Sequence, residues 1–156
     1  MRTSSRTAWN FAVIAMTALL AVGSSAAAQG TTASAMVNPD QATAQQMAAL
    51  PNMNAMLAAA VVAKRPFKTM LDVDAVLKPT LSAEQRAQLY ARLFRPINLN
   101  TASREEIMLI PGMGPRMAHE FEEYRPYRNI EQFRREIGKY VDQKAVGRFE
   151  RYVSLP

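Results

Sequence analysis

The segment 111–116 (PGMGPR) restricts how this chain can fold more than any other part of the sequence. Gly112 and Gly114 flank a single apolar residue, Met113, and glycines this close together predict a tight turn or the close approach of another molecule. Pro115 follows directly. Proline suits the first position of a helix, because the N–H that it lacks would have no intrahelical partner there.

A short helix is predicted just before this turn. Ser103 followed by Glu106 has the pattern of a capping box, which opens a helix over residues 104–110. The chain is therefore expected to run from a helix through a tight glycine turn into a second helix. At such a turn several amide N–H groups and the positive end of the helix dipole point the same way, an arrangement that suits an anion.

These residues match a known pattern. Ile97-Asn-Leu-Asn-Thr-Ala-Ser103, followed by Glu106, Ile110 and the 111–116 segment, resembles the helix-hairpin-helix domain of the ComEA family. Members of that family are DNA receptors of bacterial competence that work outside the cytoplasmic membrane. The resemblance covers residues 97–156, is strongest over 97–118, and implies that the hairpin amides hold a phosphate of double-stranded DNA without reading the bases. By motif position the resemblance carries over to Gly112, Gly114 and Arg116, and the phosphate site that we predict consists of these residues together with Met113.

The sequence departs from that family in two places. Met117 stands where such hairpins often carry a second basic residue. The family's second glycine hairpin should fall near residues 138–140, where Gly138 has no second glycine beside it. These departures favour an alternative interpretation, in which the chain is an envelope protein-interaction module that has kept the fold and lost DNA binding.

The first 28 residues have the pattern of a secretory signal peptide. Two arginines, Arg2 and Arg6, precede an apolar run over residues 11–22, and three alanines then offer a cleavage site after Ala28. The pattern predicts a periplasmic or secreted protein, and an uncleaved membrane anchor is the alternative. The chain has no cysteine, so its fold has no disulfide framework.

An internal repeat follows a flexible lead-in over residues 29–36. When the chain is shifted by sixty residues, 37–96 lies over 97–156 with eight identical positions and coinciding apolar positions. The fold class that this predicts is all-α, with no sheet, as two tandem degenerate copies of a four-helix unit. The helices are expected over 44–50, 55–65, 70–77, 83–93, 104–110, 115–124, 130–137 and 143–153.

The two expected copies differ at the turn. Asn52 and Asn54 take the places of Gly112 and Gly114. Asparagine tolerates the left-handed backbone conformation, so the turn keeps its shape, while the added side chains obstruct a phosphate that approaches the amides. The first hairpin is therefore interpreted as structural and the second as the functional one.

Charge is the main argument against DNA as the partner. Residues 97–156 carry ten Lys or Arg against nine Asp or Glu, and such a nearly neutral segment favours DNA only if its charges segregate. Lys64, Arg65, Lys68 and Arg128 are the residues expected to add further contacts to the DNA backbone.

No other chemistry is supported by the residue types. His119 is the only histidine, and no cysteine or second histidine could complete a metal site or a nucleophilic triad. We expect no catalytic residue, no cofactor, no metal, no small-molecule substrate and no enzymatic activity. The sequence leaves open whether a monovalent cation binds to the hairpin carbonyls.

Overall fold

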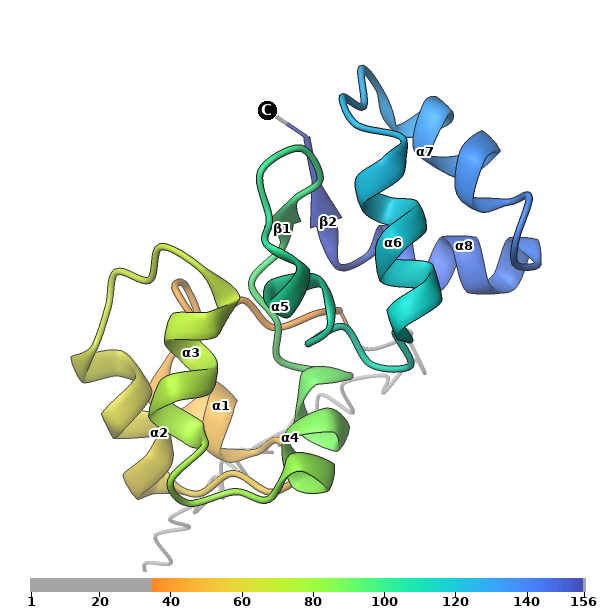
Figure 1. Cartoon of the computed structure of the whole chain (residues 1–156). Helices are drawn as coiled ribbons and strands as arrows, with labels where there is room; N and C mark the ends of the chain where they lie inside the picture. The colour runs from red at the N-terminus through yellow and green to blue at the C-terminus, as the bar shows by residue number, and fades with distance from the viewer. Residues whose placement is uncertain (1–34, 156) are drawn as a thin grey trace, which may run out of the picture. The chain divides into compact units, whose positions relative to one another are not determined.

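The structure is a computed structural model that describes residues 35–155 (Figure 1). The predicted signal peptide, its cleavage after Ala28 and all but the last two residues of the lead-in lie outside the described residues. Within residues 35–155, no helix is both long and apolar enough to cross a bilayer.

The described residues are mostly helical, which confirms the predicted all-α class. Figure 1 shows α1 to α4 grouped together, and α5 to α8 grouped around two short strands. In chain order the elements are α1 (Ala44–Ala48), α2 (Ala55–Ala63), α3 (Met70–Leu77), α4 (Ala83–Tyr90), β1 (Ile97–Asn98), α5 (Arg104–Ile107), α6 (Pro115–Glu123), α7 (Ile130–Ile137), α8 (Gln143–Glu150) and β2 (Val153–Ser154).

The expectation of no sheet is wrong. β1 pairs with β2 in parallel, with Ile97 opposite Val153 and Asn98 opposite Ser154. Strands of two residues are too short to show an alternating pattern, so the sequence gives no signal for them. A single bridge between Val37 and Leu93 occupies the corresponding place in residues 37–96.

Most helices begin where a polar residue caps them. The N-cap side chains each accept a hydrogen bond from the third helical amide, at Thr43, Thr69, Ser82, Ser103, Asn129 and Asp142. Several helices are shorter than predicted. The chain tightens after α1 and α5, where Leu50 donates to Met47 O and Ile110 to Ile107 O, three residues back.

The capping box predicted at Ser103 is only half formed. The Ser103 hydroxyl accepts from the Glu106 amide, but the Glu106 carboxylate does not return to Ser103. Instead, Glu106 Oε1 accepts from the Met70 amide at 2.6 Å, and the Glu106 side chain is buried. Glu106 therefore caps α3 from α5 and ties the two halves of the described body together.

Residues 37–96 and 97–156 also share a bracing arginine. Arg65 donates from Nε to Pro39 O and from Nη2 to Ala42 O, and Arg125 makes the same two bonds to Leu99 O and Ala102 O. Two residues after each of these arginines an aromatic residue is buried, Phe67 in one half and Tyr127 in the other. The buried residues of both halves form one hydrophobic core.

Candidate nucleic-acid interface

The glycine hairpin is held by one left-handed residue and one buried side chain. Gly112 has φ +78°, a conformation that favours glycine, and the Met113 amide donates to Ile110 O at 2.9 Å. The Met113 side chain is buried, which fixes the turn against the core. Gly114 is the N-cap of α6 with φ −110°, so its backbone needs no glycine. What Gly114 provides is space, since no atom lies within 4 Å of the place that its Cβ would take.

This hairpin leaves several amide groups open. Among the described residues, the N–H groups of Gly112, Gly114, Arg116 and Met117 have no acceptor, and no side chain caps α6. The first intrahelical bond is from the Ala118 amide to Gly114 O. These N–H groups stand at the positive end of the α6 dipole, the arrangement that receives an anionic oxygen.

The first hairpin has the same backbone but is closed by its own side chains. Asn52 has φ +61°, and its Nδ2 donates to Gln85 O and to Gln88 Oε1 on α4. The Asn54 side chain accepts from the Leu57 amide at 2.8 Å. The amide equivalent to that of Met117 is therefore already used, and a side chain stands where an anion would approach.

An arginine on α5 fixes the start of α6. Arg104 donates from Nη2 to Pro115 O at 2.9 Å and forms an ion pair with Glu122 through Nη1. These two contacts hold the first turn of α6 against α5. Sequence reasoning gave Arg104 no role beyond its place in the capping pattern.

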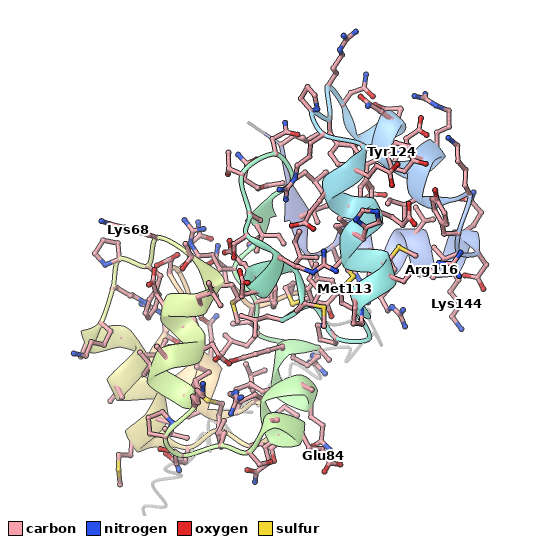
Figure 2. The ribbon with its side chains drawn as sticks, in the orientation of Figure 1. Lys68, Glu84, Met113, Arg116, Tyr124 and Lys144 are labelled. Atoms are coloured by element: carbon pink, nitrogen blue, oxygen red, sulfur yellow. The ribbon has the colours of Figure 1, made fainter. Side chains whose placement is uncertain are left out.

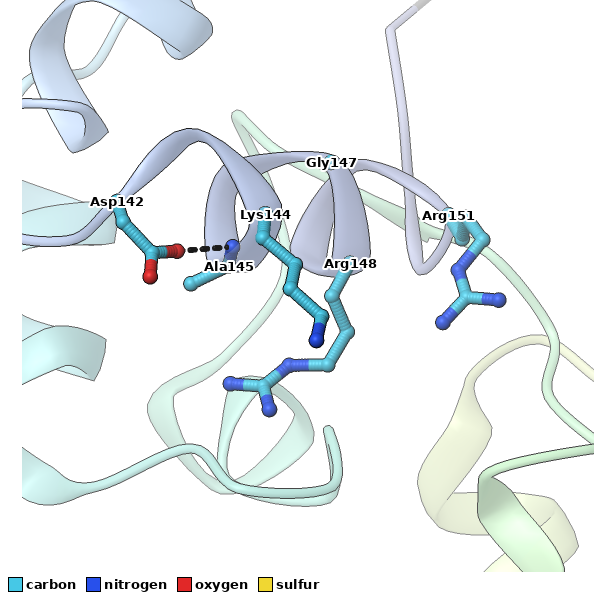
Figure 3. A pocket seen from close by; sticks show the side chains of 6 residues that line it. All are labelled: Asp142, Lys144, Ala145, Gly147, Arg148 and Arg151. Atoms are coloured by element: carbon cyan, nitrogen blue, oxygen red, sulfur yellow. Dashed lines mark hydrogen bonds between the residues drawn. The ribbon is translucent and has the colours of Figure 1, made fainter.

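Arg148 on α8 reaches the hairpin itself. A Cβ placed on Gly112 would lie 3.4 Å from Nη2 of Arg148, an ordinary van der Waals contact, so this guanidinium lies directly beside the turn. Figure 3 shows the Arg148 side chain extending from α8 on the same side as Lys144. Sequence reasoning did not single out Arg148. The signal that could have found it is the spacing of Lys144, Arg148 and Arg151, which puts three basic residues on one face of a helix.

Comparison with known proteins finds a match in this part of the chain. Residues 94–150, which contain the hairpin and α8, match a model of the helix-hairpin-helix motif. This segment carries a helix-hairpin-helix motif. The match confirms the helix-hairpin-helix part of the resemblance. Such motifs generally bind DNA without reading its sequence, which is consistent with a nucleic-acid partner. No curated protein and no solved structure matches the chain.

The predicted basic residues do not all gather at the helix-hairpin-helix turn. Arg116 is exposed beside the turn, and Figure 2 shows Lys68 on the opposite side of the view from Arg116 and Lys144. Lys64 and Lys68 line a separate pocket over α2 and α3, and the Arg65 guanidinium is occupied by Pro39 O and Ala42 O.

The last of the predicted basic contacts lies beyond the C-terminal end of α6, away from the hairpin at its N-terminal end. Arg128 is exposed in the loop between α6 and α7, where it lines a pocket with Arg135. Of the supporting set, the structure therefore places none against Gly112.

Ion pairs occupy part of the charge of residues 97–156. The carboxylates of Glu122, Glu131, Glu136 and Glu150 pair with Arg104, Arg134, Arg135 and Lys139. The hydrogen bond from Arg134 lowers the pKa of Glu150, and that from Lys139 lowers the pKa of Glu136. Within the described residues, the basic side chains of this segment without a carboxylate or carbonyl partner are Arg116, Arg128, Lys144, Arg148 and Arg151.

The described residues do not form a cluster of metal-ligating side chains. No group of three or more His, Cys, Asp or Glu side chains comes together in residues 35–155. His119 is exposed on α6, and its Nε2 lies 3.4 Å from Glu123 Oε2.

Proposed function

We propose that this chain binds double-stranded DNA without sequence specificity by holding a backbone phosphate at the helix-hairpin-helix turn. The observation that carries the proposal is the set of four open amides at Gly112, Gly114, Arg116 and Met117. The phosphate oxygens accept from these N–H groups, and the exposed Arg116 adds a full positive charge. In this proposal the contacts go to the DNA backbone and not to base edges, so they fix position and not sequence.

The proposal extends to where the protein works. The basic start, apolar run and alanine-rich end of residues 1–28 support export, and the resemblance to the ComEA family supports a role in DNA uptake or retention at the cell envelope. This last step rests on analogy with that family. In this proposal the chain is a binding protein and not an enzyme, and it needs no cofactor. The motif match does not favour the protein-interaction alternative.

We also propose that residues 37–96 and 97–156 are two copies of one unit. α2, α3 and α4 have the same bounds as α6, α7 and α8 after a shift of sixty residues. The bracing bonds of Arg65 and Arg125 support the same shift. In this proposal the first copy keeps the architecture, while the second holds the phosphate.

Fluorescence anisotropy of labelled duplex DNA, titrated with the purified protein at several salt concentrations, tests the DNA proposal. We expect binding that is equal for unrelated sequences and weakens steeply with salt, with a slope of about 0.9 per phosphate contact. A folded, helical protein that binds no duplex at low salt would overturn the proposal. Strong preference for one sequence would contradict the phosphate-only contact.

A further inference from the structure

We infer that the exposed face of α8 formed by Lys144, Arg148 and Arg151 is a second phosphate-binding element of this interface, taking the phosphates next to the one at the hairpin. The inference rests on the proposed function and adds residues that neither the resemblance nor the motif match assigns. We call these three side chains the α8 basic face.

The α8 basic face lines a hollow on the protein surface (Figure 3). The hollow has a volume of about 520 Å³. Gly147 has no side chain that could fill the hollow. No atom lies within 4 Å of the place that its Cβ would take, so the space beside it is open. The hollow is lined by Asp142, Lys144, Ala145, Gly147, Arg148 and Arg151.

The one acid in this hollow does not neutralise it. Asp142 is the N-cap of α8, and its Oδ1 accepts from the Ala145 amide at 2.7 Å. The only carboxylate on α8 itself, Glu150, pairs with Arg134 on α7. Asp142 keeps its own negative charge, but neither Asp142 nor Glu150 pairs with the three basic side chains. The hollow therefore carries more positive than negative charge, which is the arrangement that attracts a polyanion.

The α8 basic face continues the hairpin site in space. The Arg148 guanidinium lies against Gly112, so an anion on the open amides is within its reach. Lys144 and Arg151 stand about one helical turn to either side of Arg148, and a turn of helix rises about 5.4 Å. A polymer of regularly spaced phosphates can contact all three residues along α8, whereas a single small anion cannot.

The first segment shows that this face is not required by the fold. The positions equivalent to Lys144, Arg148 and Arg151 on α4 are Glu84, Gln88 and Ala91. Gln88, the equivalent of Arg148, accepts a hydrogen bond from Asn52, the equivalent of Gly112. The glycine and the arginine thus occur together where the hairpin is open, and an asparagine and a glutamine occur together where it is closed.

The test is a titration of duplex DNA with the triple variant Lys144→Gln, Arg148→Gln and Arg151→Gln. The matched control is Lys78→Gln, Arg135→Gln and Lys139→Gln, which removes the same charge from exposed side chains that are not expected to contact DNA. We expect the α8 variant to weaken binding to all sequences and to lower the salt slope by about 2 to 3, since each phosphate contact contributes about 0.9. The control should change the slope by less than 1.

Equal effects of the two triple variants would overturn the inference, because net charge alone would then explain them. So would an α8 variant that binds like the wild type. A wild-type protein that binds no duplex would instead contradict the proposed function, so the two failures are distinguishable. Circular dichroism melting checks the fold of each variant, and the single change Arg148→Gln, expected to lower the slope by about 1, replaces the triple variant if that does not fold.

Discussion

At the scale of single residues, the difference between the two hairpins comes from a few side chains on one backbone. Asn52 and Gly112 both have positive φ, so the turn has the same form in both segments. Asn54 caps α2 with its side chain, whereas Gly114, the N-cap residue of α6, has no side chain that could do so. An asparagine N-cap stabilises a helix slightly more than glycine, so the open amides of the second hairpin come at a small cost in stability.

Arg116 provides the first residue-scale prediction. Arg116→Gln should weaken binding equally for unrelated duplexes and lower the salt slope by about 1, because the side chain contacts a phosphate and no base. Its exposed position without a carboxylate partner predicts that stability changes by less than about 0.5 kcal/mol. Arg135→Gln is the control, since Arg135 pairs with Glu136 away from the hairpin. An equal effect of the two variants in the titration would remove Arg116 from the site.

At the scale of the elements, Glu106 connects α5 with α3. Its buried carboxylate accepts from the Met70 amide, a group at the start of α3 that has no intrahelical acceptor. The equivalent residue in the first segment, Gln46, is exposed and completes the capping box of its own helix. One position thus caps its own helix in one segment and a neighbouring helix in the other.

Glu106→Ala should therefore lower the free energy of unfolding by about 2 kcal/mol, because it leaves a buried amide without its charged partner. Gln46→Ala removes only an exposed half of a capping box and should cost less than about 1 kcal/mol. Urea unfolding followed by circular dichroism measures both values. If Glu106→Ala costs no more than Gln46→Ala, Glu106 does not hold the two halves together.

The contact between α7 and α8 gives a prediction about pH. Arg134 lowers the pKa of Glu150 below its ordinary value of 4.5, so the unfolded chain takes up the proton first as the pH falls. The stability from this pair is complete above about pH 4.5 and is lost as the pH falls through the lower, folded-state pKa.

Glu150→Gln should accordingly be less stable than the wild type at pH 7, and the difference in melting temperature should shrink below about pH 4.5. Thermal melts between pH 7 and pH 3 measure this difference. Glu84→Gln, which changes an exposed glutamate outside any ion pair of the described residues, controls for charge alone. A Glu150→Gln difference that stays constant with pH would contradict the role of the Arg134 pair.

At the scale of the whole molecule, the features that could be predicted from the sequence are those that depend on residues close together in the chain. The cap at Ser103 and the glycine turn into the next helix follow from residue types at fixed spacings, and the structure confirms them. The β1–β2 pairing and the Glu106–Met70 bond join residues far apart in the chain, and no local pattern announces them.

The same reason explains what sequence reasoning missed at the site. Net charge made residues 97–156 a poor candidate for DNA, because the sequence does not show which carboxylates are already paired. Once Glu150 is assigned to Arg134 and Asp142 to the Ala145 amide, the α8 basic face remains unpaired beside Gly112. Arg65 shows the reverse, since a basic residue expected on the surface is used to brace the fold.

The most direct test of the open hairpin is the affinity for duplex DNA of Gly114→Asn, which copies Asn54 of the first segment. Its backbone and surroundings accept a side chain, and the new amide should cap the Met117 N–H, so the variant should be at least as stable as the wild type. We predict that it nonetheless binds duplex DNA at least tenfold more weakly, about 1.4 kcal/mol, at the same salt concentration. A stable Gly114→Asn protein with unchanged affinity would contradict a phosphate on the hairpin amides.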